Sequence, residues 1–210
     1  MRSLKLSALV VAGLVLSSCG GTFVPPAAVV NGVAISQAAV EDRLEAALAD
    51  PSLAGQLTGP SGGERKADIA RQVLALLIRQ QILAGYAETH RVTVTGAEIQ
   101  QSLSQAIEQI GGQAQFNHEL KIRGLTVADV RENIRQVLLA QKVQQAVVTA
   151  SGTPTDVSPQ QADQIFTQWL TTELRRADIE VNPRFGAFDV KRATVCRLSS
   201  TAGDVTCPTA

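Results

Sequence analysis

The chain has 210 residues, with 19 basic and 19 acidic side chains and only 3% aromatic residues. This even balance excludes the basic excess that a nucleic-acid-binding surface requires, so we expect no nucleic-acid partner. With so few aromatic side chains, the core has to be built from Ala, Val, Leu and Ile, which is typical of packed helices.

A secretory signal peptide is predicted at the N-terminus. Arg2 and Lys5 form a short basic head, and Leu6–Leu16 follows without a charge. This run falls short of the roughly 20 apolar residues that span a bilayer, so we expect residues 1–18 to be removed rather than kept as a transmembrane anchor. The mature chain would then carry 17 basic and 19 acidic residues, a net charge of −2.

Cys19 is predicted to carry lipid. Leu16-Ser17-Ser18-Cys19 resembles the lipobox of bacterial lipoproteins, which implies cleavage before Cys19 and acylation of its thiol. Acyl chains contribute about 0.8 kcal/mol per buried methylene, so two or three of them would hold the protein on the extracytoplasmic face of the cell membrane. Residues 19–27 would be the lipidated tether. The alternative is an ordinary secreted protein in which Cys19 has no special role.

A β-hairpin followed by a helix is predicted to open the folded part. Asn31-Gly32 separates the apolar segments Ala28–Val30 and Val33–Ile35. An Asn-Gly pair between two apolar runs is the strongest short-range hairpin signal. Ser36 is then expected to cap the next helix.

Two long helices are predicted in the middle of the chain, after a flexible Gly- and Pro-rich loop at Asp50–Glu64. The first helix, about Lys66–His90, is apolar on more than half of its surface in the middle, so it has to be surrounded by its own domain or by a bound client. Thr126 and Asp129 form a capping box that begins the second helix, which reaches Val148. Its apolar stripe consists of Val127, Val130, Ile134, Val137 and Leu138.

Three shorter helices are predicted from local signals. Thr95 and Glu98 form another capping box, and the helix that they begin ends at a Gly pair. Phe116–Ile122 reads as a short helix before a further Gly. Ser158 followed by Pro159 is an N-cap with Pro at the first helical position.

The C-terminal part holds one predicted strand and two cysteines. Ile179–Val181 reads as a strand, whereas Arg184–Ala210 has little periodicity. If Cys19 is lipidated, Cys196 and Cys207 are the two remaining thiols of an exported protein, so a disulfide between them is predicted. It would close a loop of about ten residues and add roughly 2–3 kcal/mol of local order. The alternative is two free or mispaired thiols in a disordered end.

Four segments in the same order resemble the SurA and PrsA families of extracytoplasmic bacterial chaperones. They are Ala28–Gly32, Thr95–Ile99, Gly124–Thr126 with Arg131–Ile134, and Ala177–Gly186. The resemblance covers about residues 28–188 and leaves 189–210 as a C-terminal tail. It implies a mostly α-helical chaperone domain with a small two- or three-stranded sheet, in which Val29–Asn31 pairs with Ile179–Val181.

The chain departs from these families in one respect. Relatives usually insert a parvulin-type prolyl isomerase domain before the C-terminal helix, but only about Ala150–Ser158 occupies that place here, too few residues for a domain. The resemblance therefore implies a holding function without an enzymatic one. We expect no catalytic residue, no cofactor and no metal, because His90 and His118 have no further ligand patterned near them.

The functional hypothesis is a holdase for unfolded or nascent exported proteins. Their apolar segments would bind in a shallow cradle between the helices Ala67–His90 and Thr126–Val148. The candidate client-binding residues are Leu77, Tyr86, Phe116, Phe166 and Trp169. The alternative for Phe166 and Trp169 is that they anchor the C-terminal helix in the core. The alternative function is that of an envelope lipoprotein with one fixed partner, and the sequence does not determine the oligomeric state.

Overall fold

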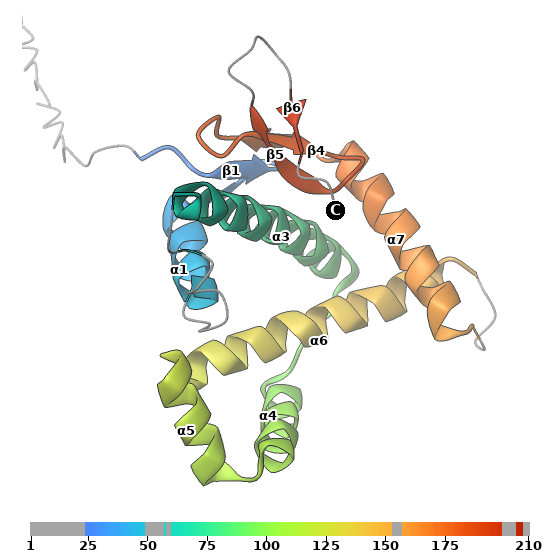
Figure 1. Ribbon diagram of the computed structural model, residues 1–210. Helices are drawn as coiled ribbons and strands as arrows, with labels where there is room; N and C mark the ends of the chain where they lie inside the picture. The colour runs from blue at the N-terminus through green and yellow to red at the C-terminus, as the bar shows by residue number, and fades with distance from the viewer. Residues whose placement is uncertain (1–23, 49–56, 58–59, 153–156, 199–204, 208–210) are drawn as a thin grey trace, which may run out of the picture.

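The structure is a computed structural model that describes residues 24–48, 57, 60–152, 157–198 and 205–207 (Figure 1). Its helices are α1 (Gln37–Leu48), α3 (Gly62–His90), α4 (Gly96–Ile110), α5 (Gln113–Arg123), α6 (Val127–Ala150) and α7 (Pro159–Arg176). Its strands are β1 (Ala28–Val30), β2 (Val33–Ile35), β3 (Ile179–Val181), β4 (Ala187–Asp189), β5 (Thr194–Leu198) and β6 (Val205–Thr206). The predicted mostly helical fold is confirmed. The predicted signal peptide, Cys19 and most of the tether and of the 50–64 loop lie outside the described residues.

The first sheet joins the two ends of the domain. Its strand order is β2-β1-β3, with Val29 opposite Ala34 on one side and Glu180 on the other, all antiparallel. Asn31 and Gly32 adopt positive φ angles of 49° and 80° in the hairpin turn, a conformation that Asn and Gly reach at the lowest cost. Both the hairpin and the pairing of the first strand with Ile179–Val181 are confirmed.

Polar side chains hold this sheet at both of its ends. Asn31 Oδ1 accepts a hydrogen bond of 2.9 Å from the backbone N–H of Asp178. Asn182 Nδ2 donates to the carbonyl of Pro26 at 3.1 Å. Arg184 donates to Gln37 Oε1 at 2.8 Å. These bonds join positions 147 to 156 residues apart, so they stabilise the closure of the whole chain.

Helix α3 is the centre of the main core. It packs against α1, α6, α7, β1 and β5, and its Leu74 and Ile78 are fully buried. The buried side chains around it are Ala27, Ala28, Val30, Ile35, Val40, Ala75, Ile82, Leu174 and Val195. The core is built from aliphatic residues, as the composition predicts.

Helix α6 connects two parts of the molecule (Figure 1). Its C-terminal half is buried at Val143 and Val147 against α3 and α7. Its N-terminal half follows the α4–α5 hairpin. Lys142, in the C-terminal half, joins α6 to the start of α4, because its Nζ lies 2.6 Å from Glu98 Oε1 and donates to the Thr93 carbonyl at 2.7 Å. The predicted caps at Thr95, Thr126 and Ser158 are all present. The predicted cap at Ser36 is present as well, since Ser36 Oγ accepts a hydrogen bond from the backbone N–H of Ala39 at 3.0 Å. Within the described residues, none of the helices combines the length and hydrophobicity needed to cross a bilayer.

A second sheet, which the sequence did not predict, forms in the C-terminal segment. Its strand order is β4-β5-β6, and β5 packs against α3, where Val195 and Cys196 are buried. Cys196 and Cys207 form a disulfide with a Cα–Cα distance of 4.4 Å, so the predicted pairing is present. The sequence did not predict these strands because alternation of apolar and polar residues over only three residues in β4 and five in β5 does not stand out from an irregular sequence.

Helix α3 begins earlier than predicted. Gly62–Glu64 belongs to the helix rather than to the loop. The carbonyl of Ser61 accepts a hydrogen bond from the N–H of Arg65 at 3.0 Å, and Glu64 places a negative charge in the first turn, where the helix dipole stabilises it. This local stabilisation offsets the low helix propensity of the two glycines.

Substitution of Gly186 should destabilise the fold strongly. Gly186 has a φ of +123°, and a Cβ at this position would overlap the backbone carbonyl of Cys196 in the adjacent strand. We expect Gly186→Ala to lower the free energy of unfolding by more than about 1 kcal/mol. Gly85→Ala is the control, because Gly85 lies in α3 with open space around it. That change should raise stability by about 0.5–1 kcal/mol. Urea unfolding of both variants measures the difference, and equal effects would contradict the assigned backbone geometry.

Stability should also fall in acid because of Glu98. The hydrogen bond from Lys142, followed by those from Thr95, lowers the pKa of Glu98 from 4.5 to about 2. The unfolded chain therefore takes up a proton that the folded chain does not, so the stabilisation is complete above about pH 4.5 and is lost as the pH falls towards 2. Glu98→Gln should remove this dependence.

The measurement is the free energy of unfolding of the native chain and of Glu98→Gln over this pH range. Glu108→Gln on the same helix is the control, since the Glu108 side chain has no partner among the described residues. If the difference in the free energy of unfolding between the native chain and Glu98→Gln stays constant down to about pH 2, the carboxylate is not held by Lys142 in solution.

Candidate functional site

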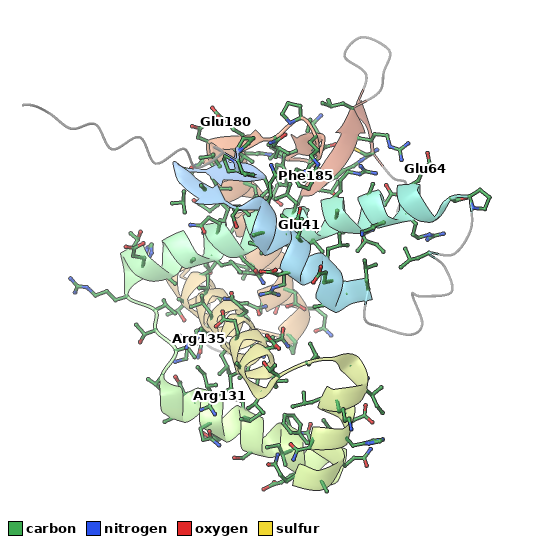
Figure 2. All side chains as sticks on the ribbon, turned by 90° about the vertical axis from the view of Figure 1, so that its left-hand side faces the viewer. Glu41, Glu64, Arg131, Arg135, Glu180 and Phe185 are labelled. Carbon is green, nitrogen blue, oxygen red and sulfur yellow. A yellow bond between two sulfur atoms is a disulfide. The ribbon has the colours of Figure 1, made fainter. Side chains whose placement is uncertain are left out.

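An open groove of about 360 Å³ lies between α1, α3 and α6. Helix α3 forms its floor, α6 forms one wall, and α1, which crosses in front of α3 in Figure 2, reaches it with Arg43. The side chains that line it are Arg43, Leu76, Arg79, Gln80, Leu83, Asn133, Gln136, Val137, Leu139, Ala140 and Leu170. We refer to this hollow as the α3–α6 groove.

The groove presents apolar side chains to water. Leu76 of α3 is 40% exposed and Val137 of α6 is 48% exposed, and both line it. Leu83 and Leu139 are half-buried beneath them, where the floor of the groove meets the second core cluster. An apolar concavity of this kind is the usual form of a binding site for an apolar ligand.

The apolar stripe of α6 explains why the groove is open. Val143 and Val147, in the C-terminal half of the helix, are buried against α3 and α7. In the N-terminal half Val127 is 40% exposed, as Val137 is 48%, because there α6 moves away from the main core towards α5. The predicted apolar stripe, in the N-terminal half of α6, is therefore only partly covered, and its Val137 forms part of one wall of the groove.

The polar side chains of the groove are neutral or positively charged. Arg43 and Arg79 contribute the charges, and none of the described residues that line the groove carries a carboxylate. Arg79 Nε is buried without a hydrogen-bond partner among the described residues. A guanidinium without an acceptor is costly, so the Arg79 side chain, which lines the groove, is a point where a ligand can gain binding free energy.

The five predicted client-binding residues do not lie in the α3–α6 groove. Tyr86, Phe166 and Trp169 form one aromatic cluster, with Trp169 5.0 Å from Tyr86 and 5.4 Å from Phe166 between ring centroids. Together with the buried Val143 and Val147 this cluster fixes α7 to α3 and α6, which is the alternative, structural role considered for Phe166 and Trp169. Leu77 is half-buried against the main core. Phe116 is only 3% exposed in the α4–α5 hairpin.

Two groove residues, Leu76 and Val137, were not singled out as binding residues from the sequence. Both belong to apolar patterns that the sequence shows, but periodicity identifies an apolar face without showing which neighbour covers it. Leu76 and Leu77 are adjacent in the sequence, and only the placement of α1 and α6 decides that Leu77 is packed and Leu76 is open. Only the exposed fraction of each side chain in the folded domain distinguishes the open Leu76 from the packed Leu77, and the sequence does not contain this information.

Two other hollows are less suited to an apolar ligand than the α3–α6 groove, because their linings are more polar. One, of about 410 Å³, is lined by Tyr86 and Trp169, so two of the predicted client-binding residues face this hollow and not the α3–α6 groove. His90 also lines it, with its ring stacked on Tyr86 at 3.9 Å and its Nδ1 3.0 Å from the Tyr86 carbonyl. The other, of about 440 Å³, lies between α1 and the start of α3. Asp189, Cys196 and Cys207 lie close together, but the two sulfur atoms are bonded to each other and offer no thiolate for a metal.

The connection between α6 and α7 has the length that the sequence predicts. Helix α6 ends at Ala150 and α7 begins at Pro159, which leaves eight residues, 151–158, between them. The two helices are packed side by side, and Gln144 Nε2 donates to Asp163 Oδ1 at 2.7 Å. This part of the chain contains no parvulin domain.

Comparison with known proteins agrees with this fold. Residues 4–144 match the model of the SurA-like N-terminal domain. Over 130 residues the chain is 29% identical to a protein named Chaperone SurA from Chromohalobacter salexigens, and this match covers 61% of the chain and 29% of the relative. The chain thus spans less than a third of that relative's length. Because the family model covers about two thirds of the sequence, the chain belongs to the family of proteins with a SurA-like N-terminal domain.

Proposed function

We propose that the protein is a chaperone of the holdase type that binds apolar segments of unfolded, newly exported proteins in the α3–α6 groove. The observation that carries the proposal is the open apolar groove itself, with Leu76 and Val137 exposed on its two sides. Membership of the SurA-like family and the similarity to a protein named Chaperone SurA support a chaperone role. Binding in such a groove requires neither nucleotide nor metal.

The size of the groove favours weak, rapidly reversible binding. Its volume of about 360 Å³ is at the lower end of the range for small-molecule pockets, so only a few client side chains fit at once. Each apolar side chain that is fully buried contributes about 1.5–3 kcal/mol, and the ordering of the client offsets part of this gain. Weak binding suits a holdase, because a client has to be released to fold.

The proposal includes anchoring to the membrane and excludes prolyl isomerase activity. The basic and apolar N-terminal segment and the lipobox-like residues before Cys19 support lipidation and a location on the extracytoplasmic face of the cell membrane. The eight-residue connection between α6 and α7, at the place where relatives of the SurA and PrsA type usually carry a parvulin domain, supports holding without isomerisation.

Polar substitutions in the groove should weaken client binding. We expect the double variant Leu76→Ser, Val137→Ser to bind an unfolded client about 5- to 30-fold more weakly, which corresponds to a loss of roughly 1–2 kcal/mol of apolar burial. The measurement is suppression of aggregation of a reduced, denatured model protein by residues 20–210, as a function of chaperone concentration.

The control for this experiment is Ile110→Ser, Ile122→Ser. These side chains are 42% and 56% exposed on α4 and α5, outside the groove, so their loss removes as much exposed apolar surface. Exposed substitutions of this kind change stability by only about 0.5 kcal/mol, so both proteins should fold. Equal losses in the two double variants would show that general surface hydrophobicity, and not the groove, captures clients.

Substitution of Cys19 should release the protein from the membrane. With Cys19→Ser we expect no incorporation of labelled palmitate and recovery of the protein in the soluble envelope fraction, whereas the native chain is labelled and sediments with membranes. Labelling of the Cys19→Ser variant would contradict lipidation at this position.

Crosslinking of the anchored protein distinguishes the two functional hypotheses: a holdase gives many substoichiometric clients, and a single stoichiometric partner would indicate an adaptor.

A further inference from the structure

The positive charge of the α3–α6 groove comes from two arginines that have no partner among the described residues. Arg43 of α1 and Arg79 of α3 both line the groove, and neither forms an ion pair or a side-chain hydrogen bond within the described part of the chain. The buried Arg71 of the same helix α3, by contrast, is paired with Asp68. Arg79 is distinctive because its Nε is buried and still has no acceptor.

Among the described residues, no carboxylate lines the groove or pairs with either arginine. The remaining polar residues that line the groove are Gln80, Asn133 and Gln136, all neutral. Glu132 is the nearest acidic residue along α6, and it already accepts from Gln136 at 2.7 Å and pairs with Arg135 at 3.2 Å. On α1, Glu41 and Glu45 line the hollow on the other side of the helix instead. Helix α7 contributes only Leu170 to the groove.

From this arrangement we infer that the α3–α6 groove selects apolar polypeptide segments that carry a carboxylate, an Asp or Glu side chain between apolar ones, with Arg79 as the residue that determines this specificity and Arg43 as its support. The inference rests on the proposed function, since it names the class of client segment that the same groove prefers. A carboxylate supplies the acceptor that Arg79 lacks, and the apolar neighbours of that carboxylate contact Leu76 and Val137.

The chemistry of arginine explains why the preference is for a carboxylate. The planar guanidinium presents several N–H donors that match the two oxygens of a carboxylate, and it is weakly hydrated compared with an ammonium group. Apolar walls exclude water and strengthen the ion pair. A neutral segment offers Arg79 only uncharged amide or hydroxyl oxygens, which accept more weakly than a carboxylate, and a segment with Lys brings a third positive charge to Arg43 and Arg79. The order of affinity is therefore acidic, then neutral, then basic.

The test uses three fluorescent peptides that share one apolar sequence and differ at a central residue, which is Glu, Gln or Lys. Their affinity for the purified protein is measured by fluorescence anisotropy at low and at high salt. We expect the Glu peptide to bind about 10-fold more tightly than the Gln peptide, and the Lys peptide to bind more weakly than either. The Glu-to-Gln ratio should fall at high salt, because ions screen the partly exposed pair.

Variants of the two arginines assign the effect to the groove. Arg79→Gln should reduce the Glu-to-Gln ratio to about 2-fold or less, Arg79→Lys should restore part of it, and Arg43→Gln should reduce it by a smaller amount. Arg175→Gln is the matched control, because Arg175 is an exposed residue of α7 outside the groove, and it should leave the ratio unchanged. Thermal unfolding by circular dichroism checks that each variant folds, and Arg43→Gln keeps the test decisive if Arg79→Gln does not.

The outcomes separate this inference from the proposed function. If the Gln peptide binds and the Glu peptide binds equally well, the preference for a carboxylate is wrong while capture of apolar segments stands. If the ratio is about 10-fold but is the same in Arg79→Gln and Arg43→Gln, the carboxylate is recognised elsewhere and the inference also fails. If none of the three peptides binds, both the inference and the proposed function are wrong.

Discussion

The pairing of β1 with β3 is the constraint on which the rest of the structure depends. These strands come from opposite ends of the domain, and their antiparallel register places Val29 opposite Glu180. The entropic cost of closing a loop rises only by about 0.6 kcal/mol for each doubling of its length, so a few hydrogen bonds between the two ends of the domain are enough to support such a distant pairing. Here Asn31, Asn182 and Arg184 supply those contacts. With the ends joined, α3 is enclosed on one side by strands and on the other by helices.

The groove follows from the way in which α3 is enclosed. A helix that is apolar around more than half of its circumference needs partners in several directions, and α1, β1, β5, α6 and α7 provide most of them. Helix α6 covers α3 only with its C-terminal half, where Val143 and Val147 are buried, and then leaves the core towards α5. Leu76 and Val137 are exposed at the point of divergence. The binding surface is thus the part of the core that the domain leaves uncovered.

Features that depend on neighbouring residues were predictable from the sequence, and features that depend on distant packing were not. The turn at Asn31-Gly32 and the caps at Thr95 and Thr126 are determined by side chains within three residues of the backbone groups that they satisfy. The strand β5 has only five residues, and its identity depends on packing against α3. The choice between Leu76 and Leu77 as the open residue depends equally on distant elements. The charged groove could not be predicted because Arg43 and Arg79 lie 36 positions apart on helices whose crossing the sequence does not encode locally.

The position of the last core residues has a consequence for how the chain reaches its native state. Leu174 and Val195 complete the core around α3, and β3 completes the first sheet. A chain emerges from the ribosome, or from a translocation channel, with its N-terminus first. Strand β1 can pair with β3 only after about 150 further residues have emerged. The apolar surface of α3 stays incompletely covered until almost all of the chain has been released. The core is therefore completed only after nearly the whole chain has been released, and until then the protein exposes apolar surface of its own, as do the clients that we propose it binds.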